Sequence, residues 1–423
     1  MSASAAPGAA SADDRRARRL PALAAILAIF TAIFASNVPT PLYGVWQAQW
    51  GFSDGALTAM FSVYVVGVVA ALPTIGALSD LAGRRQVLVP GLLCMAAAAL
   101  VFASAGDIYW LGVGRLLTGL GTGIVTGSAT AALVELDPDN NWARSAAISA
   151  MTLTAGATAG PLVSSAALRF DLWPTAGPFA VVGTVAAATI VLMVTVRWPA
   201  HLGQRRPGFR LRHWRPTRLS VPREIFGSFA LAGAAMCLAW STGSLYAALG
   251  PSLAVELAGI DDRALAGLYA AAFQLVAGVG QFLARRHHPE QLLFTGPLIL
   301  GAGMSIGVVG ILLTSPLGFA LGTVTTAFGA GVTAMGAVAT ISREAPIDRR
   351  GEVVSSFYVL AYLTMASVVL GVGTASDGFG LEPTMIALGG LTLAAAGILV
   401  RAGVRSGRAG WSAPAAEASR SRA

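Results

Sequence analysis

The sequence predicts an all-α polytopic membrane protein in which twelve transmembrane helices form two pseudo-symmetric six-helix bundles. The 423 residues are 55% hydrophobic and only 11% charged, and the mean hydropathy of +0.69 exceeds what the core of a water-soluble domain requires. Runs of about 20 apolar residues recur along nearly the whole chain, and each is long enough to cross a hydrocarbon layer of roughly 30 Å as a helix. A weak internal repeat relates the first six runs to the last six.

The amino-terminal half begins with a polar arm, residues 1–19, which is rich in Ala and Ser and ends in four arginines. We expect this arm to be disordered and cytoplasmic. The first apolar run is too long for the apolar region of a signal peptide and is followed by further runs, so it is predicted to be a retained helix. Breaks at charged, proline and glycine clusters predict an N-terminal bundle, residues 20–197, with helices near 20–43, 55–75, 86–105, 108–132, 144–168 and 175–197.

The carboxyl-terminal half repeats this organisation after a basic cytoplasmic linker, residues 198–224. The C-terminal bundle, residues 225–403, is predicted to contain helices near 225–249, 263–284, 291–313, 317–341, 353–375 and 384–403. Residues 404–423 are expected to form a cytoplasmic tail.

The placement of arginine predicts the orientation, because positive residues are retained on the cytoplasmic side during insertion. With the amino end inside, only Arg169 and Arg263 fall in outer loops and Arg115 within a span, while the short outer loops carry acids. We therefore expect a multi-pass protein of the plasma membrane with both termini cytoplasmic and its spans in contact with the lipid bilayer. These topological anchors also explain the net charge of +8, so no nucleic-acid partner is expected.

The composition excludes several function classes. All 28 basic residues are arginine, whereas a phosphate-binding Walker loop and a retinal Schiff base both require lysine. The four histidines lie in polar segments, and Cys94 and Cys237 lie in apolar runs without neighbouring metal ligands, so no metal site and no cofactor are expected. The serines of "GSAT" and "STGSLY" have no histidine at membrane depth, which argues against an enzyme.

The two halves keep a fixed offset where they resemble each other most. Gly51, Asp54, Ala56, Leu57 and Phe61 correspond to Gly259, Asp262, Ala264, Leu265 and Tyr269, each 208 positions further on. Parallel six-span repeats of this kind characterise one large group of secondary transporters, whose substrate site lies between the halves.

The segment "GALSDLAGRR" interrupts the apolar sequence between the second and third spans. Its residues Gly76, Leu78, Asp80, Gly83, Arg84 and Arg85 resemble the G-x-L-x-D-x-x-G-R-[RK] signature of the major facilitator superfamily. Gly76 permits close helix approach, Gly83 lets the chain leave the helix, and Asp80 can reach a helix N-terminus or an arginine on the inner face. The resemblance implies a charged latch that holds the outward-open state and breaks when the cavity opens inward.

The fourth span carries "RLLTGLGTG", which resembles a second signature of the same family. Arg115 lies deep in this span, so we expect it to face the protein interior and to have a partner there; snorkelling to the outer interface is the alternative. Gly119, Gly123 and Gly127 recur every four residues on one helix face, a spacing that permits close helix packing.

The fifth span carries "GATAGP", in which Gly156, Gly160 and Pro161 resemble the G-x-x-x-G-P signature of proton-coupled drug exporters. The glycine pair that usually follows the proline is Ser164 and Ser165 in this sequence. The resemblance to the twelve-span drug:proton antiporter type implies export, whereas tight packing without directional meaning is the alternative.

The family resemblance implies alternating-access transport by a monomer, with proton-coupled efflux as the leading expectation and metabolite or nutrient uptake as the alternative. Because Arg115 is the one fixed charge deep in a span, a small hydrophobic or amphipathic substrate is expected. No acid lies near the centre of a span, so Asp54 and Glu135, at span ends, are the candidates for proton coupling. The predicted cavity residues are uncharged hydrogen-bonding or aromatic side chains of the spans: Asn37, Tyr43, Tyr64, Trp240, Tyr246, Gln274, Tyr358 and Tyr362.

Overall fold

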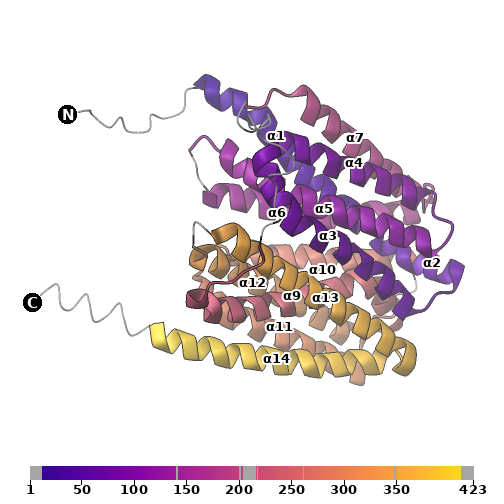
Figure 1. Ribbon diagram of the computed structural model, residues 1–423. Coiled ribbons are helices and arrows are strands. Elements are labelled where there is room, and N and C mark those ends of the chain that lie inside the picture. The colour runs from indigo at the N-terminus through magenta and orange to yellow at the C-terminus, as the bar shows by residue number, and fades with distance from the viewer. Residues whose placement is uncertain are drawn as a thin grey trace, which may run out of the picture. The chain divides into compact units, whose positions relative to one another are not determined.

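The computed structural model describes residues 12–139, 142–199, 202, 216, 218–260, 262–346 and 349–410. This part of the chain is helical and contains no strand, which confirms the predicted all-α class (Figure 1). The helices are α1 (Ala12–Asn37), α2 (Tyr43–Trp50), α3 (Asp54–Ala82), α4 (Arg84–Ala103), α5 (Ile108–Leu136), α6 (Trp142–Arg169), α7 (Gly177–Thr195), α9 (Phe226–Glu256), α10 (Arg263–Ala284), α11 (Pro289–Leu312), α12 (Pro316–Glu344), α13 (Arg350–Phe379) and α14 (Leu381–Gly410).

The chain divides into two compact units. Unit 1 comprises Met1–Trp50 and Met60–Arg218, and unit 2 comprises Gly51–Ala59 and Leu219–Ala423. The division near residue 218 falls within the linker that the sequence predicts. The assignment of Gly51–Ala59 differs from the predicted bundle boundaries, because the first turns of α3 pack with unit 2 whereas the rest of this helix packs with unit 1.

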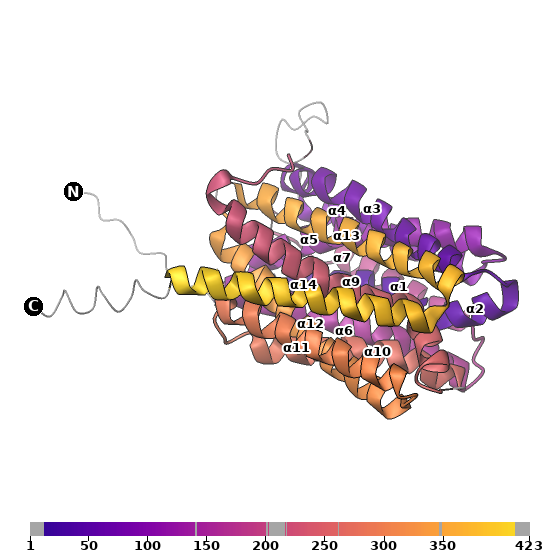
Figure 2. The same ribbon diagram turned by 90° about the horizontal axis from the view of Figure 1, so that it is seen from below.

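Each unit is a bundle of long helices. In unit 1, α1 packs on α5, α6 and α7, and α4 packs on α5 and α7. In unit 2, α12 contacts α9, α10 and α11, and α11 also lies along α14 (Figures 1 and 2). The contact between α11 and α12 is the most extensive, because glycines such as Gly303 and Gly329 let the two backbones approach until a methyl group would not fit.

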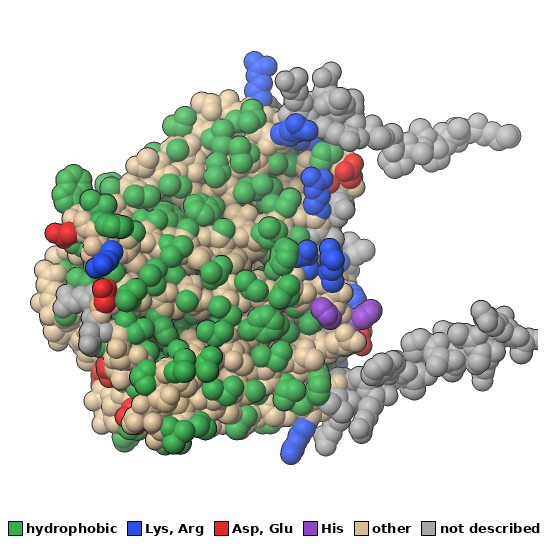
Figure 3. All heavy atoms as spheres, turned by 180° about the vertical axis from the view of Figure 1, so that it is seen from behind, with side chains coloured by type: hydrophobic (Ala, Val, Ile, Leu, Met, Phe, Trp, Pro, Cys, Tyr) green, Lys and Arg blue, Asp and Glu red, His purple; other side chains and the backbone are tan. Residues whose placement is uncertain are grey.

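Many large hydrophobic side chains are exposed on the long helices, as a bilayer requires. Eleven of the helices in the described part are long and apolar enough to cross a membrane, and α6, which is rich in Ser, Thr and Gly, is the twelfth long helix. Figure 3 shows hydrophobic side chains over the middle of one face, with the His and most of the Arg side chains toward one edge and most acidic side chains toward the other. We call the helix ends near Arg84, Arg343 and Arg349 arginine-rich, and those near Asp54, Asp107 and Asp262 acid-rich.

The positions at which the helices begin and end are set by local features, such as prolines and capping side chains, that a hydropathy profile does not detect. The predicted first span is broken by a 3₁₀ turn, Thr40–Leu42, because Pro39 and Pro41 cannot donate a helical hydrogen bond. The aspartates Asp107 and Asp262 cap α5 and α10 by accepting two backbone N–H bonds each. Other helices run several residues beyond the predicted spans, because hydrogen bonding continues into the polar interfacial turns.

Candidate functional site

The signature segment forms the end of α3 and the start of α4. Gly83 precedes α4 with a φ of 96°, a conformation that a side chain would strain. Arg84 follows it and is 9% exposed; its Nε and Nη2 donate to Oε2 and Oε1 of Glu135 at 3.2 and 2.7 Å, and its Nη1 donates to Ser79 Oγ. This bidentate pair joins the arginine-rich ends of α4 and α5.

Two other signature residues, Arg85 and Leu78, do not take part in the pair between Arg84 and Glu135. Arg85 donates to the Val194 carbonyl at 2.8 Å, which ties α4 to α7, and Leu78 is half-buried. The side-chain surroundings of Gly76 and Asp80 lie outside the described residues, so the latch expected of Asp80 stays a prediction. Glu135, a candidate for proton coupling, is engaged by Arg84.

Arg115 lies two turns from the acid-rich start of α5 and is only 2% exposed, so it faces the interior of unit 1. Its Nη1 donates to the Ser36 carbonyl at 2.7 Å, at the C-terminal end of α1 where the helix dipole favours a cation. Its Cζ lies 5.1, 4.8 and 5.9 Å from the ring centroids of Tyr43, Phe61 and Tyr64. We call these three rings around the guanidinium the Arg115 box.

The Arg115 box buries polar atoms whose hydrogen bonds are incomplete. Nε and Nη2 of Arg115 and the hydroxyl of Tyr43 have no hydrogen-bond partner among the described residues. A buried arginine costs roughly 3 kcal/mol on membrane-insertion scales, and each unmade hydrogen bond adds about 1–3 kcal/mol. The rings and the α1 terminus offset part of this cost.

The glycines of α5 position Arg115 against α3. A methyl group on Gly119 would overlap the Tyr64 carbonyl, and one on Gly123 would lie 2.6 Å from the Ala71 Cβ. The structure differs from the prediction at Gly127, which is exposed and has nothing within 4 Å of where a methyl group would be, so it takes no part in this packing.

The motif on α6 is a contact with α1. A methyl group on Gly156 would lie 3.0 Å from the Phe30 carbonyl oxygen, and one on Gly160 would lie 2.8 Å from the Asn37 carbonyl carbon. Pro161 follows inside α6, and Ser164, one of the two serines after it, donates to the Val38 carbonyl at 2.6 Å. The motif therefore holds α6 against the end of α1.

In unit 2, three predicted cavity residues form one aromatic cluster. The ring of Trp240 on α9 lies 5.6 Å from that of Tyr358 and 4.9 Å from that of Tyr362, both on α13. All three side chains are half-buried. We call this group the Trp240 cluster.

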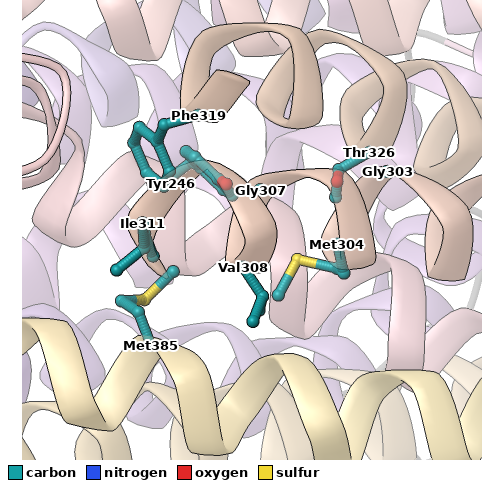
Figure 4. A pocket seen from close by; sticks show the side chains of 9 residues that line it. All are labelled: Tyr246, Gly303, Met304, Gly307, Val308, Ile311, Phe319, Thr326 and Met385. Carbon is teal, nitrogen blue, oxygen red and sulfur yellow. The ribbon is translucent and has the colours of Figure 1, made fainter. Parts of the chain in front are cut away.

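A second polar and aromatic group lies nearer the acid-rich end of unit 2. The hydroxyls of Tyr246 and Tyr269 lie 3.3 and 2.5 Å from Thr323 Oγ1, which in turn donates to the Phe319 carbonyl. Tyr246 also borders a narrow cavity between α9, α11, α12 and α14, with about 10 Å³ that a water-sized sphere can reach (Figure 4). Methionine, glycine and aliphatic side chains line most of it, so this is a packing gap rather than a substrate pocket.

The coupling candidate Asp54 takes part in a contact between the start of α3 and α13 within unit 2. Ser376 Oγ donates to Asp54 Oδ2 at 2.8 Å, and the Gly55 N–H donates to Asp377 Oδ2 at 3.1 Å. Gly373 permits the approach, because a methyl group there would clash with Thr58. We call this group of residues the α3–α13 contact.

The remaining predicted cavity residues stand apart from these groups. Asn37, half-buried at the end of α1, donates to the Ile33 carbonyl of its own helix at 2.8 Å, and Gln274 is half-buried on α10. Within the described part of the chain, no three His, Cys, Asp or Glu side chains gather closely enough to hold a metal ion.

Sequence reasoning missed several partners. Phe61 was noted only as a repeat position, yet its ring is the closest to Arg115, and Thr323 and Tyr269 were not singled out as site residues. Nothing in the sequence pairs Asp54 and Gly55 with Ser376 and Asp377, because each pair is separated by 322 positions. The 208-residue offset is the one signal that could have marked Thr323, since it occupies the position of Arg115 in the second half.

Two kinds of relative match the sequence. It is 28% identical over 276 residues to the multidrug resistance protein MdtL of Escherichia coli O17:K52:H18 (strain UMN026 / ExPEC), covering 62% of this chain and 66% of MdtL. It is 31% identical over 118 residues to the 4-hydroxybenzoate transporter PcaK of Pseudomonas putida, covering 27% of this chain and 26% of PcaK. The chain therefore spans about a quarter of the length of PcaK and just under two thirds of that of MdtL.

Solved structures share the fold over nearly the whole chain. The peptide transporter POT in complex with sulfate superposes with a TM-score of 0.74 at 16% identity, covering 94% of this chain and 99% of that one. A bacterial homologue of the human lysosomal transporter Spinster, in an inward-facing and unoccupied conformation, gives a TM-score of 0.71 at 15% identity, covering 93% and 98%. The family model described as the Major Facilitator Superfamily matches residues 25–369. The chain therefore belongs to the Major Facilitator Superfamily and is a transporter rather than an enzyme.

Proposed function

We propose that this protein is a monomeric secondary active transporter of the plasma membrane that moves small amphipathic molecules by alternating access and exports them in exchange for protons. The α3–α13 contact supports the alternating-access part. Its hydrogen bonds hold the start of α3 on α13 within unit 2, whereas the remainder of α3 packs in unit 1. Because α3 is shared between the two units in this way, breaking these hydrogen bonds would release the start of α3 from α13, as alternating access requires of one of its contacts.

The Trp240 cluster supports the proposal that the substrate is a small amphipathic molecule. Its three half-buried rings offer apolar faces together with an indole N–H and two phenol groups, a combination that suits amphipathic molecules with an aromatic or lipophilic body. The acidic residues of the long described helices lie near helix ends rather than in their middles. A strongly cationic or polyhydroxylated substrate would require more buried carboxylates and amides than these helices provide.

Export is supported by the similarity to MdtL and by the motif of α6, and protons are the proposed coupling ion. Asp54 and Glu135 remain the coupling candidates and lie at opposite ends of the spans. A proton bound at one end and released at the other would link ion movement to the opening of the two mouths.

Uptake of an organic acid is a second candidate function, and Arg115 favours it. The relatives named as 4-hydroxybenzoate and gallate transporters carry aromatic acids. A buried guanidinium is a suitable partner for such an anion.

Flux measurements in oriented vesicles test the direction. Inverted vesicles containing the protein should accumulate a lipophilic tracer when their lumen is more acidic than the medium, because protons then leave the lumen as the tracer enters. An ionophore that collapses this gradient should abolish accumulation. Asp54→Asn should reduce the coupled flux, whereas Glu382→Gln, an acid at the start of α14, serves as the matched control. Accumulation only in right-side-out vesicles would favour uptake, and a flux unaffected by pH would exclude proton coupling.

A further inference from the structure

We propose that the Arg115 box is a binding site for the carboxylate of a planar aromatic acid. This inference rests on the proposed transport of small amphipathic molecules and narrows that class to amphipathic monoanions. The main observation is that one edge of the Arg115 guanidinium has no hydrogen-bond partner among the described residues. Nε and Nη2 form one edge of arginine, whose two N–H bonds run nearly parallel and match the two oxygens of a carboxylate.

The same edge of another arginine in this protein, Arg84, binds a carboxylate. Arg84 uses its Nε and Nη2 to hold the two carboxylate oxygens of Glu135 at 3.2 and 2.7 Å. In Arg115 the equivalent two atoms are buried and have no hydrogen-bond partner among the described residues, while Nη1 is occupied by the Ser36 carbonyl. The buried hydroxyl of Tyr43, also without a partner in this part of the chain, supplies one more donor for an anion.

The repeat indicates that the fold does not require the charge. α5 and α12 are both 29 residues long and begin 208 positions apart, which places Thr323 where unit 1 has Arg115. Tyr269, the counterpart of Phe61, and Tyr246 fill that space with hydroxyl groups that lie 2.5 and 3.3 Å from Thr323. Unit 2 therefore packs the same region of the helix with neutral groups that are hydrogen-bonded to one another. We infer that the cation in unit 1 has a role other than packing.

The surroundings select the class of anion. Three aromatic rings lie within 5.9 Å of the guanidinium carbon, and they favour a flat apolar body over a hydrated inorganic ion. One net positive charge matches one carboxylate rather than a dianion or a phosphate ester.

The rings of α3 also control access. Phe61 and Tyr64 cover Arg115 in this structure, where they are 7% and 9% exposed. They follow directly after Gly51–Ala59, the part of α3 that packs with unit 2 through the α3–α13 contact. Release of that contact would let the acid-rich end of α3 move and shift both rings enough to admit the carboxylate, while they remain beside its aromatic body.

Binding to the full-length protein in lipid nanodiscs tests the proposal, with benzoate as the probe and benzamide as its uncharged isostere. The protein should bind benzoate and discriminate against benzamide. Arg115→Thr, which introduces the residue of unit 2, should weaken benzoate binding at least tenfold, in line with the loss of a charged bidentate pair. Tyr43→Phe removes one hydroxyl and should weaken it several-fold, and Arg343→Thr, in an exposed ion pair, should leave it unchanged.

Each outcome decides the question. Equal binding of benzoate and benzamide, or unchanged benzoate binding by Arg115→Thr, would overturn the proposal. If Arg115→Thr does not fold, Tyr43→Phe and the difference between the two probes decide alone. Arg115-dependent benzoate binding without export in the vesicle assay would reject the proposed direction of transport and keep this site, whereas export of neutral compounds without benzoate binding would reject the site alone.

Discussion

Substituting Gly373 by alanine should open the α3–α13 contact. A methyl group at this position of α13 would clash with the Thr58 hydroxyl and lie 2.7 Å from the Asp54 carbonyl oxygen, whereas ordinary contact begins at 3.4 Å. The Asp54 oxygen belongs to the backbone of α3 and cannot rotate away. The two helices must therefore separate by several tenths of an ångström, which lengthens the bonds from Ser376 and to Asp377.

The size of the effect follows from the cost of overpacking. Extra methyl groups in a well-packed contact cost about 1–3 kcal/mol, and 1.4 kcal/mol is a factor of ten in an equilibrium constant. Gly373→Ala should thus raise the open fraction of the contact roughly 5- to 150-fold. Gly371→Ala is the matched control, because it lies on the same helix and a methyl group there has nothing within 4 Å.

Thiol labelling measures the open fraction. With Cys94 and Cys237 replaced by alanine, Ser376→Cys provides a reporter at a position that is only 7% exposed. The rate of reaction with a membrane-impermeant maleimide should rise in the Gly373→Ala background and stay at the parent value in the Gly371→Ala background. Rates within a factor of two of each other would refute the reasoning that steric closeness at Gly373 holds this contact.

Three further predictions concern stability, measured as thermal unfolding of the purified protein. Arg84→Gln should lower the melting temperature clearly, because it leaves a partly buried carboxylate without its bidentate partner, whereas Arg343→Gln, in a pair exposed at 52% and 65%, should change it little; equal shifts would contradict the argument. Gly160→Ala should destabilise by about 1–3 kcal/mol, whereas Gly127→Ala should be neutral or stabilise by up to about 1 kcal/mol because alanine favours the helix where there is open space; the reverse order would reject the packing role of the α6 motif. Tyr269→Phe should cost about 1 kcal/mol through loss of its hydrogen bond, so an unchanged protein would show that this bond contributes nothing.

Much of the fold could be predicted because a bilayer imposes simple rules. Apolar length identified the spans, and the positive-φ glycines Gly51 and Gly259, at 68° and 65°, lie at equivalent positions of the repeat that the sequence predicts. Helix ends were less accessible to prediction, since hydrogen bonding and capping at residues such as Asp107 decide them rather than hydropathy.

The candidate site was predictable in its residues but not in its pairings. The burial of Arg115 could be predicted from its depth in the span. Its partners, three aromatic rings and a backbone carbonyl, could not, because no local sequence pattern identifies them. Gly127 continues the spacing of Gly119 and Gly123 but is exposed, because within the described part of the chain nothing lies within 4 Å of where its methyl group would be. Spacing along one helix reports which residues share a face, whereas the neighbour of that face depends on packing between helices.

Some equivalent residues of the two halves differ in their contacts, and these differences indicate which residues serve only the stability of the fold and which we propose to serve transport. Asp262 caps its own helix with bonds of 2.8 and 3.2 Å to Ala264 and Leu265, whereas its counterpart Asp54 accepts a bond from Ser376 on α13. A cap serves stability in either half, but a bond to a distant helix can break when that helix moves. The first half also carries the complete loop signature, whereas its echo in the second half, Gly280, Arg285 and Arg286, has Ala284 at the aspartate position four residues after Gly280. The asymmetric positions therefore gather on α3 and on the helices that it contacts, α5 and α13, and we propose that movement of α3 acts on the signature loop and on the buried arginine together.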